Sequence, residues 1–324
     1  MFKLLKKIID HPARLKDYFL IALAVVDDWL LKQFYVLGFR RRFELLKAKI
    51  QSIAAGSGNI FLASSYRVDS PVRKEILQVS MRQNFSGLRD ASLAFRAADA
   101  SEGEYFKSNV EFFNSFPNLK AQNLDRKSRL PTAYLELLKE SKEKYFCMLF
   151  DDMPLVGLTE GFLASATDLL KDFEGLVDLM LVEQITDFTV NTAEKKLHFR
   201  MSDLEYVQAK KKPLAIVKYG NYSFAILKNY HYGFFFNTLI APCQDYAERL
   251  KWYMENVSLE SPHKIELAGM RRMGPVYRLL AVPLDVFRID IDYSHSGISI
   301  RGVGKEVQNL FEAVRDGYSI EVSK

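Results

Sequence analysis

The chain has 324 residues, of which 48% are hydrophobic and 26% are charged. It is therefore long enough for one large domain or two ordinary ones, and its composition is not that of a disordered protein. Its two cysteines, Cys147 and Cys243, argue against a disulfide framework, and no Cys/His spacing typical of zinc sites occurs. These features predict a reducing, cytoplasmic setting.

The positive charge of the chain is concentrated at its N-terminus. Residues 1–50 contain eleven Lys or Arg and five Asp or Glu, a net charge of +6. The whole chain carries +5, so the other 274 residues sum to −1. Nothing in this balance indicates a nucleic-acid partner for the main part of the chain.

Residues 1–55 are predicted to form a basic, helical N-terminal segment. Their apolar stretch, residues 18–26, is too short to span a bilayer, and no signal-peptide pattern is present. Two interpretations follow: a helical cap packed on the main domain, or an amphipathic element on an anionic membrane surface. The second would place a cytoplasmic protein peripherally on the inner face of a membrane.

Strands and helices alternate after a break at residues 54–59, which predicts an α/β fold with a mainly parallel sheet. The predicted strands are 60–67, 91–99, 118–124 and 144–150, and the predicted helices are 70–83, 102–116 and 130–141. Ser70 is the expected N-cap of the first helix, with Pro71 just inside it. In such sheets, ligands bind beyond the carboxyl ends of the strands.

A second α/β stretch follows, with no linker after residue 60, so residues 56–324 are predicted to form one domain. Its expected elements are a helix at 158–173, a strand at 176–185, a hairpin at 188–201, a helix at 246–257, an extended stretch at 275–291 and a polar loop at 292–304. Within it, residues 59–185 and 186–324 are taken as two halves.

Polar residues follow three of the predicted strands: Ser64–Arg67, Asp99–Ser101 and Asp151–Asp152. If the sheet is parallel, these segments converge on one crevice. Adjacent carboxylates at the end of an apolar strand repel each other, and hard oxygen ligands of this kind suit Mg²⁺ or Mn²⁺. The alternative for Asp151–Asp152 is a pair of solvated turn residues before Pro154.

Three further residues have both a structural and a functional interpretation. Asp99 could cap the following helix or accept hydrogen bonds from a ribose or base. His295 could be an exposed loop residue or a metal or phosphate ligand, and Glu266 could be a solvated residue or a base that deprotonates a substrate. The motifs GxGxxG, GxxxxGK[ST] and GxSxG are absent, which argues against dinucleotide-binding, P-loop and α/β-hydrolase proteins.

The order of "IFLASSYR", "AADAS" and "KYFCMLFDDM" resembles the GT-A-fold glycosyltransferases, especially the large inverting family 2. In that family the first strand ends in a Thr/Ser–Tyr–Asn/Arg turn, the second in an Asp-rich turn and the fourth in a DxD motif. The resemblance covers residues 59–185, which it implies to be the nucleotide-sugar-binding half, with residues 186–324 as the acceptor-side half and C-terminal tail. Here "FDDM" has Met153 where another acid often stands. The resemblance therefore leaves open which of Asp151 and Asp152 binds the metal.

Carried over residue by residue, the resemblance implies a donor site, a metal site and a base. The nucleotide-sugar-binding residues would be Ser65, Tyr66, Arg67, Asp99 and Asp151. The metal ligands would be Asp152 and His295, the cofactor Mn²⁺ or Mg²⁺, and the catalytic base Glu266, with Asp245 and Glu260 as substitutes.

The resemblance implies transfer of a sugar from a nucleoside-diphosphate sugar, with a UDP-sugar as first choice, to a hydroxyl acceptor with metal-assisted inversion. The acceptor would be a glycan or a lipid-linked molecule in the synthesis of a surface polysaccharide. Two alternatives stay open: another nucleotide-sugar enzyme such as a nucleotidyltransferase, and a non-catalytic scaffold or membrane-docking protein with this fold.

Overall fold

The structure is a computed structural model, and the chain forms two compact units, Met1–Lys47 and Ala48–Lys324. The residues that it describes are 29–30, 33–45, 59–89, 93–181, 187–191, 193–200, 213–227, 238–258, 261–262, 264–265, 268, 278–288, 291–292, 299–300 and 319–323. In the first unit, residues 29–30 and 33–45 are helical. None of the helices within these ranges combines the length and the apolar content that a bilayer span requires. The predicted boundary at residue 55 stays a prediction.

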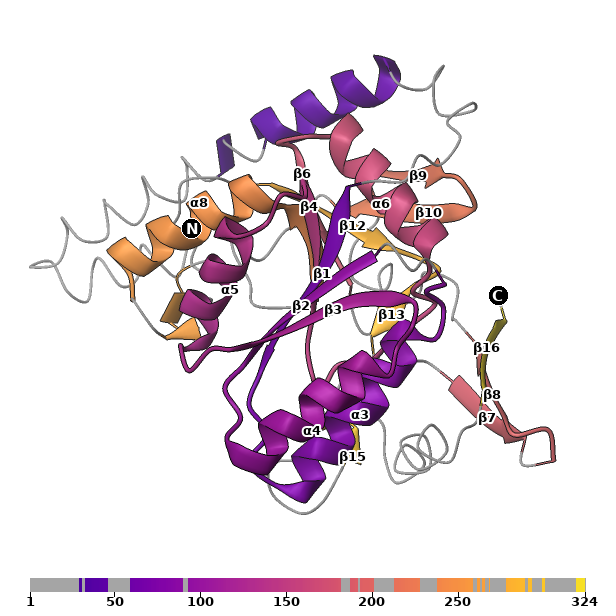
Figure 1. Cartoon of the computed structure of the whole chain (residues 1–324). Helices are drawn as coiled ribbons and strands as arrows, with labels where there is room; N and C mark the ends of the chain where they lie inside the picture. Colours follow the sequence, from indigo (N-terminus) through magenta and orange to yellow (C-terminus); the bar gives the residue numbers. More distant parts are fainter. Residues whose placement is uncertain are drawn as a thin grey trace, which may run out of the picture. The chain divides into compact units, whose positions relative to one another are not determined.

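The second unit is built on a nine-stranded sheet (Figure 1). Its strands, in spatial order, are β3 (Leu119–Asp125), β2 (Leu93–Asp99), β1 (Ile60–Tyr66), β4 (Tyr145–Leu149), β11 (Leu239–Pro242), β6 (Val177–Met180), β12 (Leu279–Pro283), β10 (Tyr222–Leu227) and β9 (Ala215–Tyr219). All of them run in the same direction except β11 and β10. The predicted α/β class, with a mixed and mainly parallel sheet flanked by helices, is confirmed.

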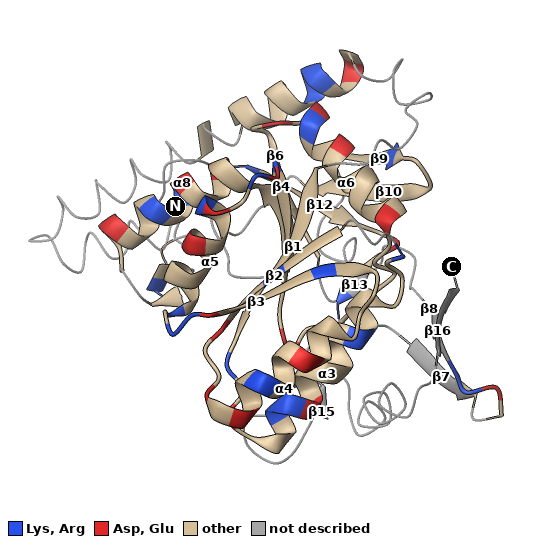
Figure 2. Cartoon of the chain, in the orientation of Figure 1, with Lys and Arg blue, Asp and Glu red and all other residues tan. Residues whose placement is uncertain are grey.

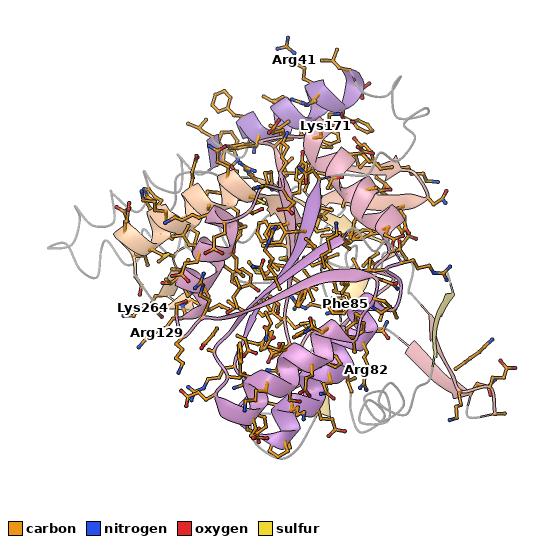
Figure 3. The ribbon with its side chains drawn as sticks, viewed as in Figure 1. Arg41, Arg82, Phe85, Arg129, Lys171 and Lys264 are labelled. Atoms are coloured by element: carbon orange, nitrogen blue, oxygen red, sulfur yellow. The ribbon has the colours of Figure 1, made fainter. Side chains whose placement is uncertain are left out.

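Helices cover both faces of the sheet. They are α3 (Pro71–Phe85), α4 (Gly103–Asn114), α5 (Leu130–Lys139), α6 (Glu160–Asp172) and α8 (Cys243–Asn256). On one face, Phe61 of β1 packs in a buried cluster with residues of α5 and α8. On the other face, Phe95 contacts Phe85 of α3 and Phe113 of α4 (Figure 3 labels Phe85). Side chains alternate between the two faces along a strand, so the same apolar strands contribute to one hydrophobic core on each face of the sheet.

The start of α3 brings the helix to the carboxyl end of β1. Ser70 is the N-cap, as predicted, and its Oγ accepts a hydrogen bond from the backbone N–H of Arg73 at 3.3 Å. Pro71 occupies the first helical position, where its missing N–H removes no helical hydrogen bond. The helix therefore starts only five residues after Tyr66, and its first turn lies beside the rim of the sheet.

The later elements differ more from the prediction. The hairpin is confirmed as β7 (Asp187–Asn191) with β8 (Lys196–Arg200), and β16 (Ser319–Ser323) pairs with β8 in parallel. The helix predicted at 246–257 begins earlier, at Cys243. The stretch predicted as a polar loop contains a strand, β15 (Ser299–Ile300), which pairs with β14 (Ile291–Asp292), and β13 (Phe287–Arg288) pairs with β5 (Leu155–Val156).

A buried ion cluster joins α8 to β6 and β12. Arg249 makes two hydrogen bonds of 3.0 Å to Asp178 and an ion pair of 3.0 Å to Asp245. Arg278, just before β12, contacts the same two carboxylates. The two arginine side chains are 6% and 7% exposed, so the carboxylates are needed to neutralise buried charge.

Replacement of Asp178 by alanine should lower the free energy of unfolding by about 2 kcal/mol, because it leaves two buried guanidinium groups with one carboxylate. Urea denaturation would measure this loss. Lys251→Ala is the matched control, since its ion pair with Glu255 is exposed and should contribute nothing measurable. Equal stability of the Asp178 variant and the wild type would contradict a structural role for the cluster.

Candidate functional site

The carboxyl ends of β1, β2 and β4 meet at one edge of the sheet. Tyr66 of β1 is paired with Asp99 of β2. Ser64 of β1 is paired with Leu149 of β4, so that Asp151, two residues further on, comes level with Tyr66. The structure thus brings together the three polar segments that follow these strands, as the parallel arrangement predicts.

Asp151 and Asp152 are the central residues of a tight turn between Phe150 and Met153. The Met153 N–H donates to the Phe150 carbonyl at 3.5 Å, and Phe150 and Met153 form an isolated antiparallel β-bridge. A turn at these two aspartates agrees with the alternative to a metal site that the sequence left open, a pair of solvated turn residues. However, Asp151 is only 7% exposed, which is not expected of a solvated turn carboxylate, whereas Asp152 is partly exposed.

The surroundings of Asp151 disfavour its ionised form. Burial, and then the charge of Asp152, raise the pKa of Asp151 to about 7, against a partial lowering by Arg73. A divalent cation would relieve both the desolvation and the repulsion, and two adjacent carboxylates are the donor chemistry that Mn²⁺ and Mg²⁺ take. The pair therefore fits the predicted metal.

Arg73 is a residue of the site that the sequence analysis missed. Its Nη2 lies 4.0 Å from Asp151 Oδ2, and its Nη1 lies 3.8 Å from Asp69 Oδ2. The guanidinium therefore stands between the first turn of α3 and the aspartate turn, where a phosphate group would meet both it and a metal on the carboxylates. The signal available in the sequence was its place three residues after the Ser70 cap.

Asp99 is completely buried and organises the rim of the sheet. Its Oδ1 accepts a hydrogen bond from the Ser101 N–H at 2.8 Å, and its Oδ2 accepts one at 2.9 Å from each amide of Asn109 and Asn123. The Tyr66 hydroxyl donates to Asn123 Oδ1 at 2.8 Å. The network ties β1, β2, β3 and α4 together, and neither asparagine was singled out in the sequence.

The network gives two predicted donor-binding residues a structural role as well. Tyr66 is 5% exposed, and burial followed by the charge of Asp99 raises its pKa. Ser65 is half-buried and Arg67 is exposed, so these two offer the more accessible groups of the first turn. Contact of Ser65, Tyr66, Arg67 and Asp99 with a nucleotide stays a prediction.

Asp99→Asn should lower the free energy of unfolding by about 1–2 kcal/mol, since one N–H of the new amide would face a donor in place of an acceptor. Thermal denaturation measures the change. Asp125→Asn is the matched control, because Asp125 is paired with Asp99 in register and is exposed. A loss of stability as large in the control would assign the effect to strand pairing and not to the network.

Three residues assigned by the resemblance, Glu266, His295 and Glu260, lie outside the described residues. Among the described residues, no three His, Cys, Asp or Glu side chains are grouped so as to hold a metal, so the aspartate pair stands there without a third ligand from this set.

Asp245 lies at the opposite end of β4 from Asp152. It follows β11, which runs antiparallel to β4, and Pro242 at the end of β11 is paired with Tyr145 at the start of β4. The length of β4 places Asp245 on the order of 20 Å from Asp152. Asp245 also contacts Arg249 and Arg278. Its suggested use as a substitute base beside Asp152 is therefore wrong.

A cavity of about 560 Å³ lies near the amino end of β4, between the end of α5 and the start of α8. Its lining includes Glu143, Lys144, Cys243, Asp245 and Lys251. Because these residues are at the amino end of β4, the cavity is separate from the aspartate turn.

No protein-family model matches the sequence, and none of the curated proteins matches it. Similar solved structures include residues 1–349 of TarS from S. aureus, with 12% identity, a TM-score of 0.39, and coverage of 71% of this chain and 59% of that chain. They also include GalNAc-T7 with UDP, GalNAc and Mn²⁺, with 8% identity, a TM-score of 0.43, and coverage of 71% and 42%. The matched part is less than two thirds of either protein. These likenesses concern the arrangement of strands and helices, and the roles of single residues depend on the site itself.

Proposed function

We propose that the protein is a glycosyltransferase that uses a nucleoside-diphosphate sugar, with a UDP-sugar as the first candidate, and transfers the sugar to a hydroxyl acceptor. The observation that carries the proposal is the aspartate turn. Asp151 is buried, has a raised pKa and lies beside Asp152 at the carboxyl end of β4. Such an arrangement is costly for folding, and a bound cation with a diphosphate would explain it.

In this proposal each part of the rim has one task. Asp151 and Asp152 hold a divalent cation, which when bound would neutralise charge on the diphosphate leaving group. Arg73, 4.0 Å from Asp151, turns its guanidinium to the same diphosphate. Ser65 and Arg67 contact the nucleotide.

The rest of the site supplies alignment and the base. The buried network of Asp99 fixes the relative position of the strand ends, so that the donor groups are preorganised. A carboxylate, for which Glu266 is our candidate, removes the proton of the acceptor hydroxyl. The acceptor oxygen then attacks the anomeric carbon of the donor sugar with inversion, and the bond from that carbon to the diphosphate breaks, so that the nucleoside diphosphate leaves. A glycan or lipid-linked acceptor, and a place in the synthesis of a surface polysaccharide, are part of this proposal.

A non-catalytic glycosyltransferase-like protein is the second candidate. It is favoured by the burial of Tyr66 and Asp99, which use their polar groups within the protein. It would keep the fold and lack turnover, because a fold does not determine an activity.

Titration calorimetry with a panel of nucleoside diphosphates, with and without Mn²⁺, tests the proposal. We expect at least one of them to bind and Mn²⁺ to increase its affinity. If none binds, the proposed function is wrong. If one binds with Mn²⁺ but the corresponding nucleotide-sugars are neither transferred nor hydrolysed, the second candidate is supported.

Arg73→Gln should reduce the affinity for the nucleoside diphosphate by about tenfold at saturating Mn²⁺, because a charge-assisted contact is lost. The affinity for Mn²⁺ alone should be unchanged or higher, since the guanidinium no longer neutralises Asp151. Calorimetry measures both. Arg82→Gln in the last turn of the same helix is the control, and it should change neither affinity. A decrease of both affinities would indicate a structural role for Arg73.

A further inference from the structure

The helix of residues 33–45 exposes large apolar side chains on one face. Phe34, Leu37 and Leu45 are 69%, 61% and 71% exposed. Their spacings of three and eight residues place them on one face of the helix, with Arg41 between Leu37 and Leu45 on the same face. Val36, by contrast, is buried. The exposed apolar face is named the Phe34–Leu45 stripe below.

The stripe is unusual within the part of the chain that the structure describes. Seven large hydrophobic side chains are exposed there, and five of them lie between residues 29 and 45, including Trp29 and Leu30. The other two, Val72 and Ile216, lie on separate elements of the second unit. Scattered exposed apolar residues are normal, but five within one short segment indicate a binding surface.

Positive charge accompanies the stripe. Arg40, Arg41 and Arg42 follow one another near its end, and all three are exposed. Figure 2 marks basic residues in blue near the end of this helix, and Figure 3 shows the Arg41 side chain projecting away from it. Residues 1–50 as a whole carry a net charge of +6. The surface therefore combines apolar side chains with cations, which would bind an anionic and partly apolar surface.

The charges also disfavour a second copy of the chain as the occupant. In a two-fold symmetric contact, the same patch meets itself, so the arginine run of one copy would be brought towards that of the other. Like charges in such a contact repel each other. An anionic bilayer has no such conflict, because its acyl boundary takes the apolar side chains and its phosphates bind the guanidinium groups.

We propose that the Phe34–Leu45 stripe and Arg40–Arg42 dock the protein on an anionic lipid bilayer, as on the cytoplasmic leaflet of a membrane. The helix lies in the plane of the interface, with Phe34, Leu37 and Leu45 in the acyl boundary. The arginines contact the headgroup phosphates. This proposal does not depend on the proposed glycosyltransferase function.

Flotation of the full chain with phosphatidylcholine vesicles, with and without phosphatidylglycerol, tests the proposal. We expect the protein to float with the anionic vesicles and to be released by salt. Replacement of Arg40, Arg41 and Arg42 by glutamine should lower the partition coefficient on the order of 100-fold. The double variant Phe34→Ser/Leu37→Ser should lower it by about tenfold for each side chain.

The control is Val72→Ser/Ile216→Ser, which removes the same number of exposed apolar side chains from other elements and should leave flotation unchanged. Equal flotation of the Phe34/Leu37 variant and the wild type would overturn the proposal. So would a wild-type dimer that this variant dissociates, because the stripe would then be a contact between copies. Nucleoside diphosphate binding, measured on the same preparations, should be the same for all variants, which separates this outcome from that of the proposed function.

Discussion

Replacing Asp152 by alanine is expected to abolish the Mn²⁺-dependent part of nucleoside diphosphate binding and to reduce sugar transfer on the order of 100-fold or more. Asp152 is the more exposed member of the aspartate pair, whereas Asp151 is buried next to Arg73. Without Asp152, a cation would have one buried carboxylate, part of whose charge Arg73 already neutralises. Metal-independent contacts from the Ser65–Arg67 turn should persist.

Calorimetry with and without Mn²⁺ measures the binding part of this prediction, and initial rates of transfer measure the other. Asp69→Ala is the matched control: Asp69 also contacts Arg73, at 3.8 Å, but its side chain is 49% exposed and lies outside the turn. Its replacement should leave the effect of Mn²⁺ intact. If the Asp152 variant still bound nucleoside diphosphate more tightly in the presence of Mn²⁺, the aspartate turn would not be the metal site.

The sequence predicts the first half of the sheet well because the signals there are local. The strand of residues 60–66 is a short apolar run, and the helix after it begins at a Ser cap followed by Pro, so both boundaries are visible in the residues themselves. The strands β9, β10 and β11 were not predicted. β11 has four residues and lies antiparallel between β4 and β6. A segment that short contains no pattern that identifies its neighbouring strands, which are distant in the chain.

The same distinction applies to the site. Two adjacent aspartates after an apolar strand are visible in one stretch of sequence, and so is their position at the rim. The asparagines of the Asp99 network are not, because Asn109 is ten residues and Asn123 twenty-four residues from Asp99 along the chain. Only the parallel register of β2 and β3 and the packing of α4 bring them to one carboxylate. A sequence pattern can identify charged groups that repel each other at adjacent positions. Hydrogen-bond partners that are distant in the chain and that the fold brings together can be identified only in the structure.

Asp151→Asn is expected to stabilise the protein in the absence of metal, and by an amount that increases with pH. The ordinary pKa of an aspartate is 3.8, and burial with the nearby Asp152 raises that of Asp151 to about 7 in the folded state. Between these values the folded protein binds more protons than the unfolded chain, so Asp151 lowers the free energy of unfolding as pH rises from about 4 to about 7. The full cost is present above pH 7.

Asparagine has a similar shape and no charge, so the variant avoids this cost. At about pH 8 its free energy of unfolding should exceed that of the wild type by on the order of 4 kcal/mol, and at about pH 4 the two should be similar. Urea denaturation at a series of pH values measures the difference, in which the titration of groups that do not interact with Asp151 cancels. A difference that is constant with pH, or that decreases as pH rises, would contradict the assignment of a buried, ionisable Asp151.

Mn²⁺ should reverse the order of stability. The cation binds the folded wild type and not its unfolded chain, so at about pH 8 saturating Mn²⁺ should raise the melting temperature of the wild type. The Asp151→Asn variant, with one carboxylate fewer, should show a smaller increase. This combination separates a metal site from a buried structural carboxylate: a gain in stability without metal and a loss of response to metal are expected together only if Asp151 is kept ionisable for a cation.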